Sequence, residues 1–356
     1  MESLTMLDEP VASIKPMKGK GGIVRLIVGC ALSAVCLYFV FRNIKFEEVG
    51  RALATFHWPY LIVGILSLAI GYTARIFRWK LLLEASGPKV TTAACASPFL
   101  ASIALNNVLP FRLGDVVRAL VFPAALGVTK TGATATLVLE RLVDLLTLLM
   151  CLAVAASFFP KGALPASVVD IVIVLAVLGS AALLSLILFT GLIVRLVRWF
   201  ATRLQPKAPE KLISVLHAIA DLVEALQSIS RMRTIIAALA ISFVAWAGEL
   251  GLYLALMQGI GMVFSLPGGL LLMSMATIAT LVPSSPGYVG PYHLAAFTAA
   301  HLMGGSATQA MTLAVLCHLG VWLPTTIAGA TVMLFHRNLF NAARNQASRD
   351  ASGDQA

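Results

Sequence analysis

Long apolar runs alternate along this chain with shorter polar segments that carry most of its charge. Six of the runs are about as long as a helix that crosses the hydrocarbon core of a bilayer, which needs about 20 residues. They cover residues 23–41, 57–74, 133–158, 168–194, 234–258 and 309–335. The pattern therefore predicts an all-α polytopic membrane protein with about six transmembrane helices.

Two further apolar stretches are interrupted by polar sequence rich in Gly and Pro. The first break, residues 104–115, reads ALNNVLPFRLGD, and the second, residues 281–293, reads LVPSSPGYVGPYH. Backbone that is not helical at membrane depth is tolerated only where protein or a watery cavity satisfies its polar groups. Interrupted helices at matching places in two halves are typical of the substrate sites of transporters, so we expect a substrate site at these breaks.

Lys and Arg residues gather on one predicted side of the membrane. By the positive-inside rule this side is the cytoplasm, and both termini lie there. A crossing by residues 91–110 would divide these charges, so we predict a re-entrant hairpin at residues 91–126 that dips in from the cytoplasm. An odd number of crossings must follow residue 258, which favours a second hairpin at residues 268–303, entering from outside. The segments on the basic side hold 21 of the 26 basic residues: 1–25, 75–130, 195–233 and 336–356.

The predicted crossings divide the chain into two repeats of opposite topology. A cytoplasmic tail of residues 1–22 precedes the first membrane repeat, residues 23–165, and the second repeat covers residues 166–335. Residues 336–356 form a second cytoplasmic tail. The two halves have three crossings and one hairpin each, which predicts an inverted-topology repeat with the two breaks facing each other. No residue-level similarity between the halves accompanies this pattern.

A less apolar linker, residues 203–233, joins the two halves on the cytoplasmic side. Its apolar residues recur at helical spacing beside charged ones. An amphipathic helix on the membrane surface fits this pattern, and so does a connecting helix packed on the bundle.

Composition excludes a water-soluble globule. The 356 residues are 59% hydrophobic and only 12% charged, with a mean hydropathy of +0.91, whereas soluble domains are about 25% charged. The net charge of +10 is spread over several loops and accompanies no nucleic-acid motif, so no nucleic-acid partner is predicted. The five Cys and six His residues follow no disulfide, metal or cofactor pattern. The first apolar run lacks a cleavage pattern and is predicted to be an uncleaved helix.

Charged residues inside predicted spans are informative because each one costs at least ~2.5 kcal/mol at a helix centre. One span carries Glu140, Arg141 and Asp144, and another carries Glu249. Arg141 and Asp144 can pair on one helix face, which would merely neutralise both. That pairing would leave Glu140 and Glu249 to be protonated or matched by a cation, so a proton-coupled or cation-binding role is the functional alternative.

The first break places polar groups directly beside arginines. Asn106 and Asn107 precede Arg112, which could bind a lipid phosphate through its two-pronged guanidinium group. Asp115 and Arg118 follow within the same hairpin. For Arg118 we favour a positive-inside anchor, although it and Arg112 are also candidate cationic partners for the intramembrane acids.

The second break offers hydroxyl groups and exposed backbone instead of charge. Ser284 and Ser285 could line a polar path, while Gly287 and Gly290 cannot continue a helix comfortably. A structural turn explains the same residues. His293 follows as the titratable group of this segment.

Four motifs occur in order along residues 20–335: Arg75-x-x-Arg78-Trp79, Asn107-Val-Leu-Pro110-Phe-Arg112-Leu-Gly114-Asp115-x-x-Arg118, Glu140-Arg141-x-x-Asp144 and Pro283-x-x-Pro286-Gly287-x-x-Gly290. This ordered set resembles the flippase-like family that includes the transmembrane region of lysylphosphatidylglycerol synthases. The resemblance implies translocation of a polar-headed lipid in a bacterial inner membrane. Phospholipid, aminoacyl-phospholipid, lipid-linked glycan and hopanoid are the candidate cargoes.

Two departures from the family pattern bear on function. Relatives commonly have an acidic residue after the second break, where this chain has Pro291-Tyr292-His293. Two interpretations stay open: His293 is its titratable substitute, or the lipid is less cationic. The SSPGYVGP sequence is similar to a hopanoid-associated branch. The full-length synthases carry an aminoacyltransferase domain after the membrane part, and this chain stops about twenty residues after its last predicted span, so lysine transfer is not expected of it.

Three classes of function compete: a lipid translocator, a membrane-embedded transferase and a non-catalytic accessory subunit of a lipid-synthesis complex. A transferase would use carboxylates at the water–lipid boundary, such as Asp115 and Asp170. The translocator hypothesis predicts that Glu140, Asp144 and Glu249 line a path between the two breaks, whose tips approach each other. A homo-oligomer or an association with lipid-synthesis enzymes stays open.

Overall fold

A computed structural model of the chain describes residues 54–336, apart from residues 88, 160–165, 205–208, 264 and 283, and several single positions between residues 31 and 51. Within this part of the chain every regular element is a helix, which confirms the all-α prediction. The predicted first span and the two predicted tails lie almost entirely outside the described residues.

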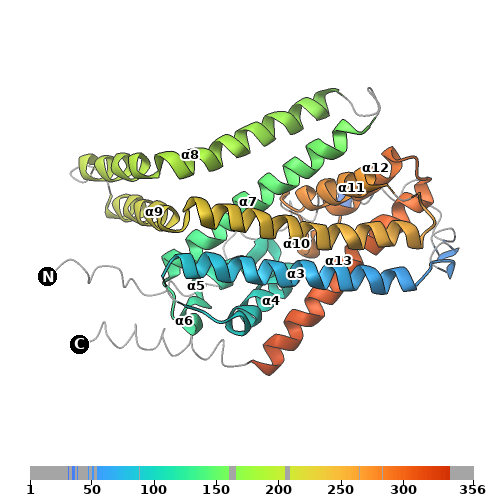
Figure 1. The fold of residues 1–356 in the computed structure, drawn as a ribbon, viewed down its shortest axis with the longest axis horizontal. Coiled ribbons are helices and arrows are strands. Elements are labelled where there is room, and N and C mark those ends of the chain that lie inside the picture. The colour runs from blue at the N-terminus through green and yellow to red at the C-terminus, as the bar shows by residue number, and fades with distance from the viewer. Residues whose placement is uncertain are drawn as a thin grey trace.

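Five long helices run along the length of the molecule (Figure 1) and correspond to five of the predicted spans. α3 continues eleven residues past the predicted end at residue 74, because Arg75 and Arg78 are buried within it and paired with carboxylates. Within the described residues, α3, α10, α13 and the 212–229 part of α9 are long and apolar enough to cross a membrane. The long helices are α3 (Pro59–Ala85), α7 (Lys130–Ser157), α8 (Ala166–Leu204), α10 (Met232–Gly259) and α13 (Ala307–Phe335).

Two helical hairpins occupy the places where the sequence is interrupted. Figure 1 shows the first one at the end of the bundle where α3 ends and α10 begins, and the second one near the opposite end. Side chains of Thr91 and Ser265 cap the first helix of each hairpin. The first hairpin comprises α4 (Thr92–Val108), η1 (Pro110–Arg112) and α5 (Leu113–Leu120), followed by α6 (Pro123–Leu126); the second comprises α11 (Leu266–Ala279), η2 (Pro286–Tyr288) and α12 (Pro291–Leu302).

The linker between the halves contains α9 (Glu210–Ile229), which packs against α7 and α8. Leu226 and Ile229 are buried in a cluster with Leu82 of α3 and Leu139 of α7. These contacts favour the connecting helix packed on the bundle.

A close approach of α3 and α10 positions two charged side chains. A Cβ atom on Gly71 would lie 2.6 Å from the Ala245 carbonyl oxygen, so only glycine permits this spacing. Arg75 follows Gly71 by one turn and faces Glu249 of α10. The backbone contact therefore fixes the geometry of a buried ion pair.

Candidate functional site

A cavity of about 510 Å³ lies between the two hairpins and the long helices. Arginine, carboxylate, tyrosine and tryptophan side chains line one part of it. Its apolar lining comes largely from α7, with Leu137, Leu145 and Leu148 among the lining residues. A polar region beside an apolar wall is suited to an amphiphilic ligand.

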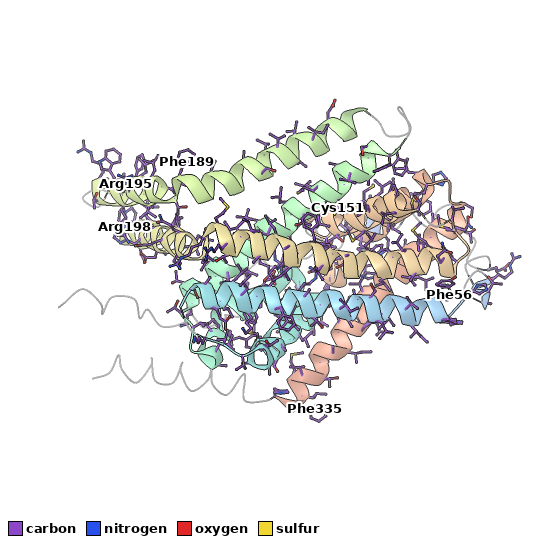
Figure 2. The ribbon with its side chains drawn as sticks, in the orientation of Figure 1. Phe56, Cys151, Phe189, Arg195, Arg198 and Phe335 are labelled. Atoms are coloured by element: carbon purple, nitrogen blue, oxygen red, sulfur yellow. The ribbon has the colours of Figure 1, made fainter. Side chains whose placement is uncertain are left out.

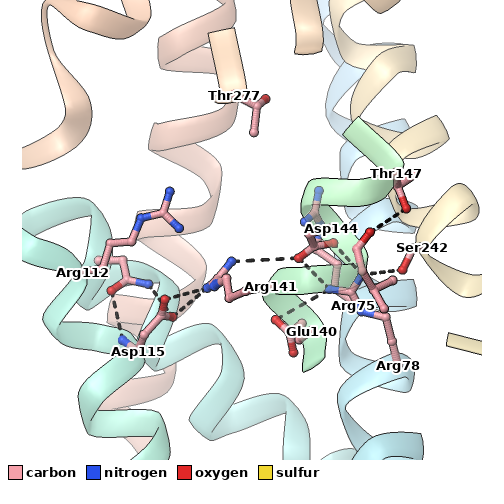
Figure 3. Close-up of polar contacts among 12 residues, drawn as sticks. Arg75, Arg78, Arg112, Asp115, Glu140, Arg141, Asp144, Thr147, Ser242 and Thr277 are labelled. Carbon is pink, nitrogen blue, oxygen red and sulfur yellow. Dashed lines mark hydrogen bonds and ion pairs between the residues drawn. The ribbon is translucent and has the colours of Figure 1, made fainter. Parts of the chain in front are cut away.

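Six charged side chains beside this cavity form a closed ring of alternating sign. Figure 3 shows the part of the ring from Glu140 through Arg78, Asp144 and Arg141 to Asp115. They come from α3, α5 and α7, so the ring joins the first hairpin to two long helices. Three positive charges balance three negative ones, and the ring is neutral. Its members, in order, are Arg118, Glu140, Arg78, Asp144, Arg141 and Asp115.

Arg78 is the most enclosed member of the ring, with no exposed surface. Its two Nη atoms donate to the two carboxylate oxygens of Asp144 at 2.6 and 2.9 Å, and Nη1 also donates to the Ser242 hydroxyl. The Glu140 carboxylate lies 3.6 Å away. Such a two-pronged contact fixes orientation as well as charge.

The other pairings differ from the predicted Arg141–Asp144 pair. Arg141 donates to both oxygens of Asp115 at 2.8 and 2.7 Å, while its nearest contact with Asp144 is 3.9 Å. Arg118 donates to Glu140 at 2.9 Å and is only 1% exposed. The surface-anchor interpretation of Arg118 is therefore wrong. Glu140 is buried behind the cavity and does not line it.

A separate ion pair satisfies the remaining intramembrane acid. Arg75 donates to Glu249 at 2.7 Å, and its guanidinium lies 4.1 Å from the centre of the Trp246 ring. Asp115, Glu140, Asp144 and Glu249 thus each have an arginine partner. Two of these partners, Arg75 and Arg78, lie outside the spans that the sequence predicts. The signal that could have found them is their spacing of three residues directly after an apolar run.

Arg112 differs from the other arginines because it has no carboxylate within 4 Å among the described residues. It donates to the hydroxyl of Thr280 at 2.8 Å and lies 5.5 Å from the centre of the Tyr288 ring. Arg112 and Phe111 both have left-handed backbone, with φ values of 53° and 59°. Such strain in non-glycine residues is typical of functional sites.

The tips of the two hairpins meet at Arg112, as predicted. The Arg112–Thr280 hydrogen bond joins the first break to the end of α11, and η1 contacts η2. A smaller cavity of about 250 Å³ lies between the tips, and Arg112, Thr280 and Tyr288 line both cavities. Arg112 therefore stands where the two cavities adjoin.

The two asparagines of the first break hold the hairpin in place. Asn106 donates to the Asp115 carboxylate and accepts a bond from the Asp115 backbone, which ties α4 to α5. The Asn107 amide donates to the hydroxyls of Thr325 and Thr326 on α13. Both asparagines line the larger cavity.

The second break contributes hydroxyl and backbone groups to the smaller cavity. Ser284, Ser285 and Gly287 line it, and the Ser284 hydroxyl is buried without a hydrogen-bond partner among the described residues. Gly287 and Gly290 have φ values of 73° and 104°, which explains why glycine occupies both places.

His293 lies outside both cavities and is buried against another histidine. Its ring centre is 4.7 Å from that of His318, which lines the larger cavity and donates from Nε2 to the Gly287 carbonyl oxygen. Prediction from the sequence missed His318 and Thr280. On helices this apolar, a single histidine or threonine looks like an ordinary packing residue.

Comparison with known protein families matches residues 26–329 to the family described as the lysylphosphatidylglycerol synthase TM region. The chain belongs to this family. The match covers both hairpins, the charged ring and Arg112, and it confirms the resemblance that the ordered motifs indicate. Membership in the lysylphosphatidylglycerol synthase TM-region family, together with the long apolar helices, identifies a multi-pass membrane protein. A comparison with curated proteins found no match.

Proposed function

We propose that this protein moves a polar-headed lipid between the two leaflets of a membrane. The observation that carries the proposal is the meeting of two interrupted hairpins at one arginine between two cavities. Hairpins of this kind bring irregular backbone to the centre of a transporter, where the headgroup needs polar contacts. Phospholipid, aminoacyl-phospholipid, lipid-linked glycan and hopanoid all have such headgroups.

Exposed apolar side chains beside the cavities support a path for the lipid tails. Phe111 lines the smaller cavity and is 38% exposed, and Val282 is 41% exposed. Leu281 lines both cavities and is 54% exposed. A headgroup at Arg112 could keep its acyl chains in the surrounding hydrocarbon through this side of the molecule. Tails that stay in the bilayer avoid the cost of exposure to water.

The proposed topology is supported by the distribution of Lys and Arg along the chain. The α4–α5 hairpin enters the membrane from the cytoplasm and the α11–α12 hairpin from the other side, in two repeats of opposite orientation. We place the protein in a bacterial inner membrane with both termini cytoplasmic. A cysteine introduced at Val121, just after α5, should react with an impermeant maleimide only from the cytoplasmic side. Labelling from the periplasm would overturn this topology.

Transport is testable with purified protein in liposomes. Fluorescent phospholipid in the inner leaflet becomes accessible to dithionite only after translocation. Arg112→Ala should slow this step by about one to two orders of magnitude, because hydrogen bonds to charged groups contribute about 1.5–3 kcal/mol. Arg112→Lys should retain part of the rate, because lysine keeps the positive charge but lacks the two-pronged guanidinium group.

The matched control removes an arginine far from the cavities. Arg198 lies on α8 beside α9 (Figure 2), is exposed, and pairs with Glu224. Arg198→Ala should transport lipid at the wild-type rate. Equal rates for Arg112→Ala and the wild type, at equal protein content, would exclude the proposed role of this site.

A further inference from the structure

The charges around the cavities do not cancel completely. The six-membered ring is neutral, and the Arg75–Glu249 pair is neutral. Arg112 then remains as one positive charge without a carboxylate partner among the described residues. An unpaired charge in a membrane interior is unfavourable, and such charges usually face a counter-ion or a functional ligand. The cluster as a whole therefore complements one negative charge.

The neighbours of Arg112 can share an anion with it. Only Nη2 of its guanidinium has a hydrogen bond in the structure, to Thr280. Ser284 lines the same small cavity and is only 9% exposed, and its hydroxyl has no hydrogen-bond partner within the part of the chain that the structure describes. A guanidinium and a buried free hydroxyl on opposite hairpins are donors that a phosphate oxygen accepts from.

The carboxylates that line the larger cavity already have arginine partners. Asp115 is bound twice by Arg141 and once by Asn106. Asp144 is bound twice by Arg78. Glu249, which also lines the larger cavity, is bound by Arg75. An ammonium group would have to compete with an arginine for each of these carboxylates, whereas a phosphate gains Arg112 directly. An uncharged polyol headgroup would leave Arg112 unpaired.

We propose that the site selects a phospholipid whose headgroup carries one net negative charge and no amine, with its phosphate bound by Arg112 and Ser284 where the two cavities adjoin. This inference rests on the proposed lipid translocation and names its substrate class. Among the candidate cargoes it favours an anionic phospholipid over aminoacylated lipids and over hopanoids with neutral headgroups.

The test compares two fluorescent lipids with identical acyl chains, phosphatidylglycerol and phosphatidylethanolamine, in proteoliposomes of the full chain. The wild type should translocate phosphatidylglycerol about tenfold faster. Thr280→Asp puts a carboxylate beside Arg112 and should remove most of this preference. Thr280→Asn has nearly the same shape without the charge and should keep it. Equal rates for both lipids in the wild type would overturn the inference while leaving lipid translocation intact.

A binding measurement separates this inference from a failure of transport. Native mass spectrometry of the detergent-purified proteins, with equimolar phosphatidylglycerol and phosphatidylethanolamine, reports which lipid stays bound. The wild type and Thr280→Asn should retain phosphatidylglycerol preferentially, and Thr280→Asp and Ser284→Ala should retain it less. If the wild type retains phosphatidylglycerol but translocates neither lipid, the proposed function fails and the headgroup assignment stands. If it retains both lipids equally, or inorganic phosphate displaces the lipid at equal concentration, the assignment fails.

Discussion

The two hairpins meet at the same place but are built from different chemistry. The first is held by charge, with Asp115 and Arg118 of α5 in a ring that reaches α3 and α7. The second belongs to a stretch with no Asp, Glu, Lys or Arg between Glu249 and Arg337. Its contacts with the bundle are apolar packing in the main core, through side chains such as Leu272, and neutral hydrogen bonds, such as those of Tyr292 and Gly287.

This difference suggests a division of labour. Ion pairs in a low-dielectric interior are strong and directional only while both partners stay in place. The charged hairpin is therefore suited to a fixed role. Neutral hydrogen bonds contribute about 1 kcal/mol each and exchange more easily. If one hairpin moves during transport, the comparison favours the second.

The two hairpins also differ in the residues that adopt positive φ in their turns. The first hairpin turns through Phe111 and Arg112, whose left-handed backbone is strained and must be imposed by its surroundings. The second turns through Gly287 and Gly290, which adopt positive φ at little cost, and through one non-glycine residue, Tyr288, whose φ is 59°. The first turn thus has two non-glycine residues whose backbone the tertiary contacts must hold in place, and the second turn has one.

The largest effect is expected from breaking the charged ring. Arg78→Met removes both bonds to Asp144 and leaves that carboxylate buried with a weaker partner, which costs about 3–5 kcal/mol when a buried pair is broken. The yield of folded protein in detergent should collapse, measured by fluorescence-detected size exclusion.

Two further variants control this prediction. Arg198→Met removes an exposed arginine and should leave the yield unchanged, since surface pairs contribute little. Adding Asp144→Asn to Arg78→Met should recover part of the folded protein, because the buried carboxylate that lost its main partner is then removed. Wild-type yield of Arg78→Met itself would contradict a structural role for the ring.

A smaller loss is expected from separating the two helices of the charged hairpin. A Cβ atom on Gly114 would overlap the Ser102 carbonyl oxygen and lie 2.8 Å from the Asn106 backbone nitrogen. Gly114→Ala should therefore lower stability by about 1–3 kcal/mol, as overpacking does, and lower the melting temperature in detergent. Gly179→Ala is the matched control, because its nearest neighbour would be 3.6 Å away. Equal melting temperatures for the two variants would show that α4 and α5 can separate freely.

The sequence predicts the helices better than the contacts between them. Length and hydropathy place both hairpins and most ends of the five long helices within a few residues, although α8 continues ten residues past its predicted end at residue 194. The predicted end of α3 is wrong by eleven residues. That error has a physical cause, since Arg75 and Arg78 look like the basic end of a span when their acidic partners are unknown. Those partners are 174 and 66 residues away in the chain. No local pattern encodes such distant pairs.

Some residues of the candidate site can be predicted from the sequence, and others cannot. Arg112 is conspicuous in the sequence because it is a charge beside a proline-containing break. Thr280 and His318 line the cavity beside it. They lie in apolar segments, where nothing in the sequence distinguishes a site residue from a packing residue. The net charge around the cavities could not be predicted from the sequence either, because it depends on which acid pairs with which arginine. The acids predicted to need a cation are all paired, and among the described residues that line the cavities the charge without an ionic partner is Arg112.

The smallest effect is expected at the neutral hairpin and completes the comparison. The Tyr253 and Tyr292 hydroxyls are 2.7 Å apart and buried. Tyr253→Phe should lower stability by about 1 kcal/mol, because it leaves the other hydroxyl without this partner. The double variant with Tyr292→Phe should cost little more, since no polar group is then stranded. Thermal unfolding in detergent measures both, with the exposed Tyr60→Phe as control. A loss as large as that of Arg78→Met would mean that the second hairpin is as rigidly fixed as the first, and the proposed division of labour would fail.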